Sequence, residues 1–172
     1  SKEIRREKLY VSRLMTGSQF IPSELSEQIL KEGKYQMIYR TIVRGRPVSI
    51  FITSFEDDNN SDKFDEWDER MLMWLYIGYE HSTCECSEEL SIYLYPTPFE
   101  KKLPTSIHET IGPSHVNSGV AWRCALHGEI AVFREEEWFK VFIHETFHAL
   151  GLDIERHHVD MIRETLQETF PV

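Results

Sequence analysis

Hydrophobic residues recur along the chain with two different spacings, and the changes between them predict where helices and strands lie. Between residues 22 and 32, apolar positions three and four apart follow Ser23 and precede Gly33, which predicts a short helix with a cap and a stop signal. Residues 35–55 are rich in β-branched and aromatic side chains, and the polar run 44–47 interrupts them. We therefore expect two strands joined as a hairpin.

The middle of the chain predicts one more helix and three more strands. Aromatic, Met and Leu side chains at helical spacing predict an amphipathic helix, and alternating polar and apolar positions predict the strands. In chain order we expect a surface loop at 56–63, a helix at 67–78, a strand at 90–95, an irregular loop at 96–113, and strands at 120–126 and 129–133 joined by a turn at His127 and Gly128.

The most strongly periodic segment begins at Arg134. Three consecutive carboxylates follow it, and acidic groups in the first turn of a helix interact favourably with the positive end of the helix dipole. Apolar residues then recur at helical spacing as far as Leu150, and Gly151 is suited to end the helix in the left-handed conformation. A last helix is predicted over residues 154–169.

Length and charge limit the classes of protein that these elements can form. A chain of 172 residues is the size of one ordinary domain, so we expect residues 1–172 to form a single folding unit. The net charge of -10 opposes binding to a phosphate backbone, and no nucleic-acid partner is expected. No apolar run is long enough to cross a bilayer, so no membrane span is expected either.

The three cysteines are Cys84, Cys86 and Cys124. This number is odd, and it is too small for the disulfide framework of a small secreted scaffold. A structural zinc site of thiolates would need four ligands and a more regular spacing. We therefore expect free thiols, a reducing compartment and a cytoplasmic location.

One short motif combines residue types that bind a metal ion. His144 and His148 are four residues apart, so a helix places both imidazoles on one face, where they can reach a single Zn²⁺ ion. Glu145 lies about 100° around the helix from His144, where its carboxylate can face the open position of the metal. Zinc makes a bound water more acidic, and Glu145 is the expected general base that takes its proton.

The strand predicted at 129–133 comes just before the motif helix. If this strand forms an edge of the sheet, an extended peptide could pair with it and present a carbonyl to the metal. An extended peptide or protein substrate is therefore the expected partner. Side-chain selectivity depends on pocket walls from several segments and is not predicted.

The sequence His144-Glu145-Thr146-Phe147-His148, followed by Ala149-Leu150-Gly151, resembles the active-site helix of the zincin metallopeptidases. The resemblance implies an α+β fold, with a twisted mixed sheet whose edge strand lies beside the HExxH helix. The wider stretch 128–153 also resembles uncharacterised predicted metallopeptidases of giant DNA viruses. That second resemblance implies a viral protein in the host cytoplasm or the virion, with other virion proteins as partners.

The third zinc ligand is left open by the sequence. In the metzincin pattern a His or Asp falls three residues after the glycine, but Ile154 occupies that position and Asp153 comes one residue early. This departure favours the gluzincin class, in which a Glu on a later helix is the ligand. The candidates within the chain are Glu164, Glu168, Asp153, His157 and His158. The giant-virus resemblance implies instead a carboxylate beyond Val172, on a helix that this chain lacks.

Two functions are consistent with these features. The first is a zinc-dependent metallopeptidase with His144 and His148 as ligands and Glu145 as general base. The second is a structural or binding protein that keeps the zincin fold without turnover, because a fold does not fix a function. Zinc binding and the effect of replacing Glu145 distinguish the two.

Overall fold

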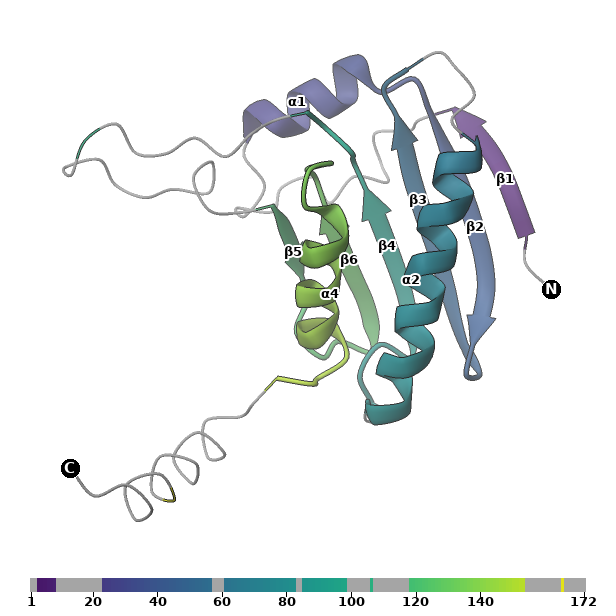
Figure 1. Ribbon diagram of the computed structural model, residues 1–172, viewed down its shortest axis with the longest axis vertical. Coiled ribbons are helices and arrows are strands. Elements are labelled where there is room, and N and C mark those ends of the chain that lie inside the picture. The colour runs from purple at the N-terminus through teal and green to yellow at the C-terminus, as the bar shows by residue number, and fades with distance from the viewer. Residues whose placement is uncertain are drawn as a thin grey trace.

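A mixed sheet of six strands forms the centre of the computed structural model, which describes residues 3–8, 23–56, 61–82, 85–98, 106, 118–153 and 165 (Figure 1). The spatial order of the strands is β1-β2-β3-β4-β6-β5. Their bounds are β1 Glu3–Lys8, β2 Tyr35–Val43, β3 Arg46–Ser54, β4 Glu89–Leu94, β5 Gly119–Ala121 and β6 His127–Val132. The helices of the described residues are α1 Ser23–Glu32, α2 Ser61–His81 and α4 Trp138–Ala149. The predicted combination of helices with a mixed sheet is confirmed.

Strands β2 and β3 form the predicted hairpin. They pair antiparallel from Tyr35 opposite Ser54 to Val43 opposite Arg46, which leaves a two-residue loop. Both loop residues have positive φ, 49° at Arg44 and 85° at Gly45. Two such residues match the twist of the flanking strands, and glycine adopts this conformation without steric cost.

The hairpin pairs antiparallel with β1 on the β2 side, whereas the strands that follow on the β3 side run parallel. β3 pairs with β4, and β4 pairs with β6, both in parallel register. Parallel strands need a crossover connection, and α2 is that connection between β3 and β4. The helix predicted at 67–78 is therefore confirmed, but it begins at Ser61 and ends at His81, so residues 61–63 of the predicted surface loop are helical.

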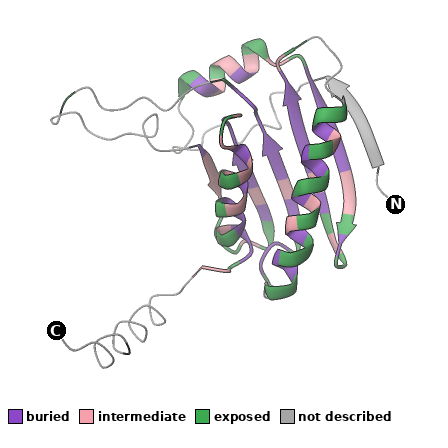
Figure 2. Ribbon diagram, viewed as in Figure 1, coloured by how far each residue is buried: buried purple, intermediate pink, exposed green. Residues whose placement is uncertain are grey.

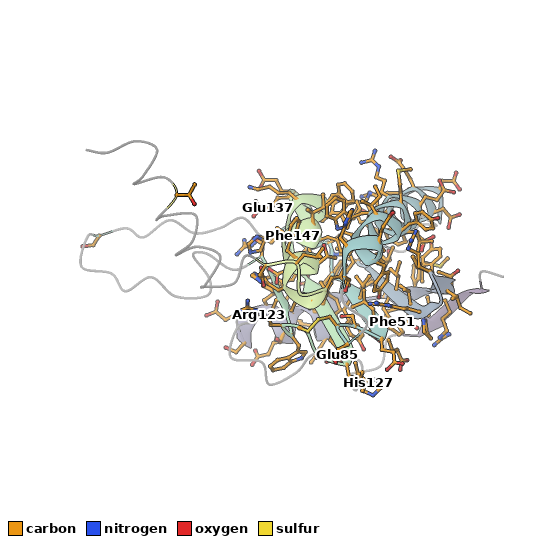
Figure 3. All side chains as sticks on the ribbon, turned by 90° about the horizontal axis from the view of Figure 1, so that it is seen from below. Phe51, Glu85, Arg123, His127, Glu137 and Phe147 are labelled. Atoms are coloured by element: carbon orange, nitrogen blue, oxygen red, sulfur yellow. A yellow bond between two sulfur atoms is a disulfide. The ribbon has the colours of Figure 1, made fainter. Side chains whose placement is uncertain are left out.

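Helices cover both faces of the sheet. On one face α2 and α4 lie side by side (Figures 1 and 3). Their buried side chains include Met71, Leu75 and Phe142. On the other face Leu25 and Ile29 of α1 pack with residues of the central strands. Figure 2 shows how the strands between these layers are mostly buried. The α4 helix is thus fixed against the sheet by its apolar face.

The strand predicted at 120–126 is wrong beyond its first residues. β5 ends at Ala121, and the chain reverses at Arg123 and Cys124, where Cys124 has φ of 44°. His127 and Gly128 are the first residues of β6 and not a turn. Gly128 is required by close packing, because a Cβ there would lie 2.1 Å from Ser87 Oγ.

The motif helix begins later than its charge pattern predicts. α4 starts at Trp138, and the acidic residues 135–137 form a turn before it. The Glu135 N–H donates to the Thr97 carbonyl at 3.0 Å, and Ser118 Oγ donates to Glu137 Oε1 at 2.7 Å. These contacts hold the acidic run outside the helix. The predicted left-handed end is confirmed, because Gly151 has φ of 66°.

The expectation of free thiols is wrong for two of the three cysteines. Cys86 and Cys124 form a disulfide across a sequence separation of 38 residues, with Cα atoms 4.3 Å apart. Their adjacency comes from the turn after β5 folding against the segment that leads into β4. Disulfides persist in oxidising environments, so the expected reducing compartment loses its basis. Cys84 lies outside the described residues.

Two further predicted segments are covered only partly by the described residues. The predicted loop at 96–113 and the predicted helix at 154–169 lie mostly outside it. None of the helices within the described ranges combines the length and the apolar character needed to cross a membrane.

Candidate functional site

The two motif histidines project from the solvent side of α4. Phe142 and Ala149 on the opposite side of the helix are buried against the sheet and α2, which turns His144 and His148 outward. Their Nε2 atoms lie 3.2 Å apart, and the two rings are perpendicular. A tetrahedral zinc ion with Zn–N bonds of about 2.0–2.1 Å holds two ligand nitrogens roughly 3.3 Å apart. The pair therefore fits two ligand positions of one zinc ion.

Glu145 lies beside this pair on the side that faces β5. It is only 8% exposed, although it is a carboxylate on an otherwise half-exposed turn of helix. Burial raises the pKa of the Glu145 carboxyl above its usual value, while the neighbouring imidazoles of His144 and His148 lower it. A carboxyl with a raised pKa next to two potential ligands is suited to accept a proton from a bound water.

The close approach of β5 to α4 explains the burial of Glu145. Gly119 lies so near the helix that an added Cβ would be 3.0 Å from Glu145 Cγ and 2.6 Å from Val141 Cγ1. Any side chain at Gly119 would therefore press on the glutamate. The position is a point of backbone contact between strand and helix, where only glycine fits.

The two intervening motif residues hold α4 to α2. Trp74 Nε1 donates a 2.7 Å hydrogen bond to Thr146 Oγ1, and Thr146 Oγ1 donates in turn to the Ile143 carbonyl at 2.6 Å. The rings of Trp74 and Phe147 lie in contact, with centroids 6.0 Å apart. These contacts fix the rotation of α4 about its axis and so the direction in which its histidines point.

The last carbonyls of α4 are bound by groups from two other segments. Three donors take part: the Cys124 N–H on the His148 carbonyl at 3.0 Å, Ser87 Oγ on the Ala149 carbonyl at 2.8 Å, and Ser82 Oγ on the Leu150 carbonyl at 2.8 Å. A Cβ at Gly151 would lie 2.6 Å from Cys86 Sγ, so the disulfide packs directly under this end of the helix. The end of α4 that carries His148 is therefore held in place by hydrogen bonds from the rest of the protein.

Asp153 contacts the outer nitrogen of His148. Its Oδ2 lies 2.9 Å from His148 Nδ1, and Arg123 Nε lies 3.4 Å from the same oxygen. The Nδ1 side of an imidazole faces away from Nε2, and Nε2 is the atom that faces His144. Asp153, a candidate third ligand, therefore lies away from the position between the two Nε2 atoms.

The structure brings together His144, Glu145 and His148, and no further candidate ligand joins them among the described residues. Within the described ranges, no three His, Cys, Asp or Glu side chains are grouped so that they could hold a metal ion. The other candidates, Glu164, Glu168, His157 and His158, lie outside those ranges. A catalytic zinc normally takes three protein ligands, so the histidine pair alone would fall one short of that number.

The predicted edge strand at 129–133 is wrong. β6 is an interior strand, with β4 on one side and β5 on the other. Val120 opposite Ala131 is the centre of the β5 pairing, and the Trp122 N–H donates to the Glu129 carbonyl at 3.2 Å. Among the described strands, β5 is the edge on the α4 side of the sheet. The chain reverses after β5, and this reversal places β6 between β4 and β5. The sequence pattern of β6 does not show that another strand covers its outer side.

Two residues of this region have no sequence signal that marks them as site residues. Arg123 and Trp74 belong to segments far from the motif, and each reaches it only through the fold. Asp153 is predicted only as a candidate ligand, because helical spacing gives no information after the helix ends at Ala149. Compared with protein-family models, curated proteins and solved structures, the chain matches none of them.

Proposed function

We propose that the chain is a zinc-dependent metallopeptidase whose centre is formed by His144, His148 and Glu145. The observation that carries the proposal is the 3.2 Å separation of the two Nε2 atoms, which fits two zinc ligands, beside a buried carboxylate. The order of a hairpin, a helix, further strands and the motif helix is similar to the amino-terminal half of the zincin fold. Zn²⁺ is the proposed cofactor.

Each side chain has a separate role in this proposal. His144 and His148 would hold the ion through Nε2, and a bound zinc ion would acidify a water molecule and polarise the peptide carbonyl. Glu145 accepts the proton of the attacking water and later returns it to the leaving amine. The burial of Glu145 favours this role, because the raised pKa of its carboxyl lies closer to neutral pH.

The proposed substrate is an extended peptide bound along β5 in place of the predicted strand. The Ser118 carbonyl and the Trp122 N–H bond to β6, so the alternation of an antiparallel pair turns the backbone groups of Gly119 and Ala121 away from β6. A peptide that pairs with Gly119 would pass directly beside Glu145. Unstructured segments are therefore expected to be cleaved in preference to folded ones.

The test combines metal analysis with proteolysis. Purified protein should contain zinc, and His144→Ala and His148→Ala should lose it, while the exposed His127→Ala should retain it. Cleavage of a peptide library should be abolished by Glu145→Gln and unaffected by Glu136→Gln, an exposed carboxylate before the same helix. Zinc that survives both histidine substitutions, or cleavage that survives Glu145→Gln, would contradict the proposal.

A binding or structural protein with the same centre is the second candidate function. It is favoured by the presence of only two donors among the described residues. The 3.2 Å separation also permits one imidazole to donate a hydrogen bond to the other. Zinc binding without cleavage in any peptide mixture would support this candidate over the peptidase.

A further inference from the structure

His148 has a second contact that the proposed function does not use. Asp153, just after the turn that ends α4, directs Oδ2 at His148 Nδ1 over 2.9 Å. We infer that Asp153 is a positioning residue, which fixes the ring and the tautomer of His148 so that Nε2 is available to a metal ion. This inference rests on the proposed function.

The chemistry of the contact determines which nitrogen carries the proton. An ionised carboxylate only accepts hydrogen bonds, so a short contact with it requires the hydrogen to be on Nδ1. In a neutral ring Nε2 then carries the lone pair, and this lone pair points toward Nε2 of His144. The opposite tautomer would direct an N–H at the ion and prevent binding. Hydrogen bonds of this kind orient metal-binding histidines and raise their basicity.

Arg123 holds Asp153 in the position that this role needs. Arg123 Nε lies 3.4 Å from the same Oδ2, so the guanidinium and the carboxylate form an ion pair. The Asp153 side chain is 20% exposed and the Arg123 side chain 63% exposed, so solvent screens the guanidinium more than the carboxylate. Arg123 is therefore expected to contribute less than Asp153.

The same short segment also holds the backbone of His148. Cys124, next to Arg123, donates its N–H to the His148 carbonyl at 3.0 Å, and the disulfide joins Cys124 to Cys86. Cys124 thus holds the backbone carbonyl of His148. Asp153, which is paired with Arg123, holds its outer nitrogen. A ligand held at two points loses less freedom when it binds a metal ion.

The first experiment measures the tautomer without any metal. In metal-free protein, nitrogen NMR of the imidazoles, assigned with His148→Gln, should show the proton of His148 on Nδ1. Asp153→Ala should move it toward Nε2, and Arg123→Ala should have a smaller effect. The control is Glu89→Gln, which removes a carboxylate 3.4 Å from the ring of His127 and should leave His148 unchanged.

The second experiment measures zinc affinity by competition with a chromogenic chelator. Asp153→Ala should weaken binding about 10- to 100-fold, the usual effect of losing such a partner. Asp153→Glu should restore part of the loss, and Glu89→Gln should bind zinc like the wild type. Circular dichroism and thermal unfolding of each variant establish that it is folded.

Three outcomes would overturn the inference. The first is an unchanged His148 tautomer in folded Asp153→Ala, and the second is zinc affinity within about twofold of the wild type. The third is complete loss of zinc with an unchanged tautomer, which would make Asp153 a ligand. If the wild type binds no zinc, the proposed function fails, while the tautomer of metal-free Asp153→Ala still decides the positioning role.

Discussion

At the scale of single residues, Glu145 shows how a site can be built at the expense of stability. The chain buries a carboxylate against β5 where a neutral side chain would be easier to bury. Two imidazoles offset part of that cost through their charge. Stability lost for the sake of an active group is common at functional sites, because activity and packing make different demands.

This reasoning predicts that Glu145→Gln stabilises the metal-free protein at neutral pH. The folded-state pKa of Glu145 is raised, so between the unfolded value of about 4.5 and the folded value the native state binds more protons. The free energy of unfolding therefore falls as pH rises through this window, and the loss persists at neutral pH. Glutamine does not ionise and avoids this loss.

Urea denaturation at a series of pH values measures the effect. The difference between Glu145→Gln and the wild type should be present at pH 7, shrink as the pH falls through the raised folded-state pKa of Glu145, and vanish below the ordinary value of about 4.5. Glu136→Gln, which replaces an exposed carboxylate, should show no such pattern. A variant less stable than the wild type at pH 7 would show that hydrogen bonds of the carboxylate outweigh its burial.

At the scale of elements, the end of α4 packs against two segments that the disulfide joins. Cys86 and Cys124 join the segment before β4 to the turn before β6, and both segments donate to carbonyls at the end of α4. The sulfur atoms also fill the space beside Gly151. Helix α4 is thus held by α2 on one side and by this cross-link at its end.

Loss of the cross-link is therefore expected to destabilise the whole described unit. Closing a loop of this size restricts the unfolded chain, and removing such a disulfide typically costs about 2–5 kcal/mol. Cys86→Ser with Cys124→Ser should lower the free energy of unfolding by that amount and make it insensitive to reductant. Cys84→Ser should keep the response of the wild type to reductant.

Thiol titration of the unfolded protein checks the pairing itself. The chain has three cysteines, of which two are paired, so one free thiol is expected before reduction and three after it. Oxidised protein with three free thiols before reduction would contradict the cross-link. A reductant response that disappears in Cys84→Ser would show that Cys84 is one of the partners.

At the scale of the whole molecule, the sequence predicts most helices and strands, but it does not predict which of them lie next to one another. Alternation and helical spacing report which face of a segment is buried, so α1, the β2–β3 hairpin, α2 and β4 were predicted within a few residues. The order of β6 and β5, the disulfide and the contact of Arg123 with Asp153 depend on segments far apart in sequence. No local pattern contains that information.

The candidate site divides in the same way. His144, Glu145 and His148 lie within one helix, where spacing alone determines that they are neighbours. The burial of Glu145 needs Gly119, and the orientation of His148 needs Asp153 beyond the end of the helix. Spacing therefore indicates the candidate site residues themselves, while the fold determines which other residues contact them.

The last prediction links the site to the stability of the whole molecule. A zinc ion that binds the folded chain through His144 and His148, but not the unfolded chain, must stabilise it by mass action. At free zinc about 100-fold above the dissociation constant this amounts to about 2.7 kcal/mol. Thermal unfolding with increasing zinc should shift upward in the wild type and in His127→Ala, but not in His144→Ala or His148→Ala. The same titration locates the third ligand: a shift that is lost in Glu164→Ala or Glu168→Ala assigns that carboxylate, and a shift that persists in both excludes them. An equal shift in wild type and His144→Ala would show that zinc binds elsewhere and would contradict the proposed centre.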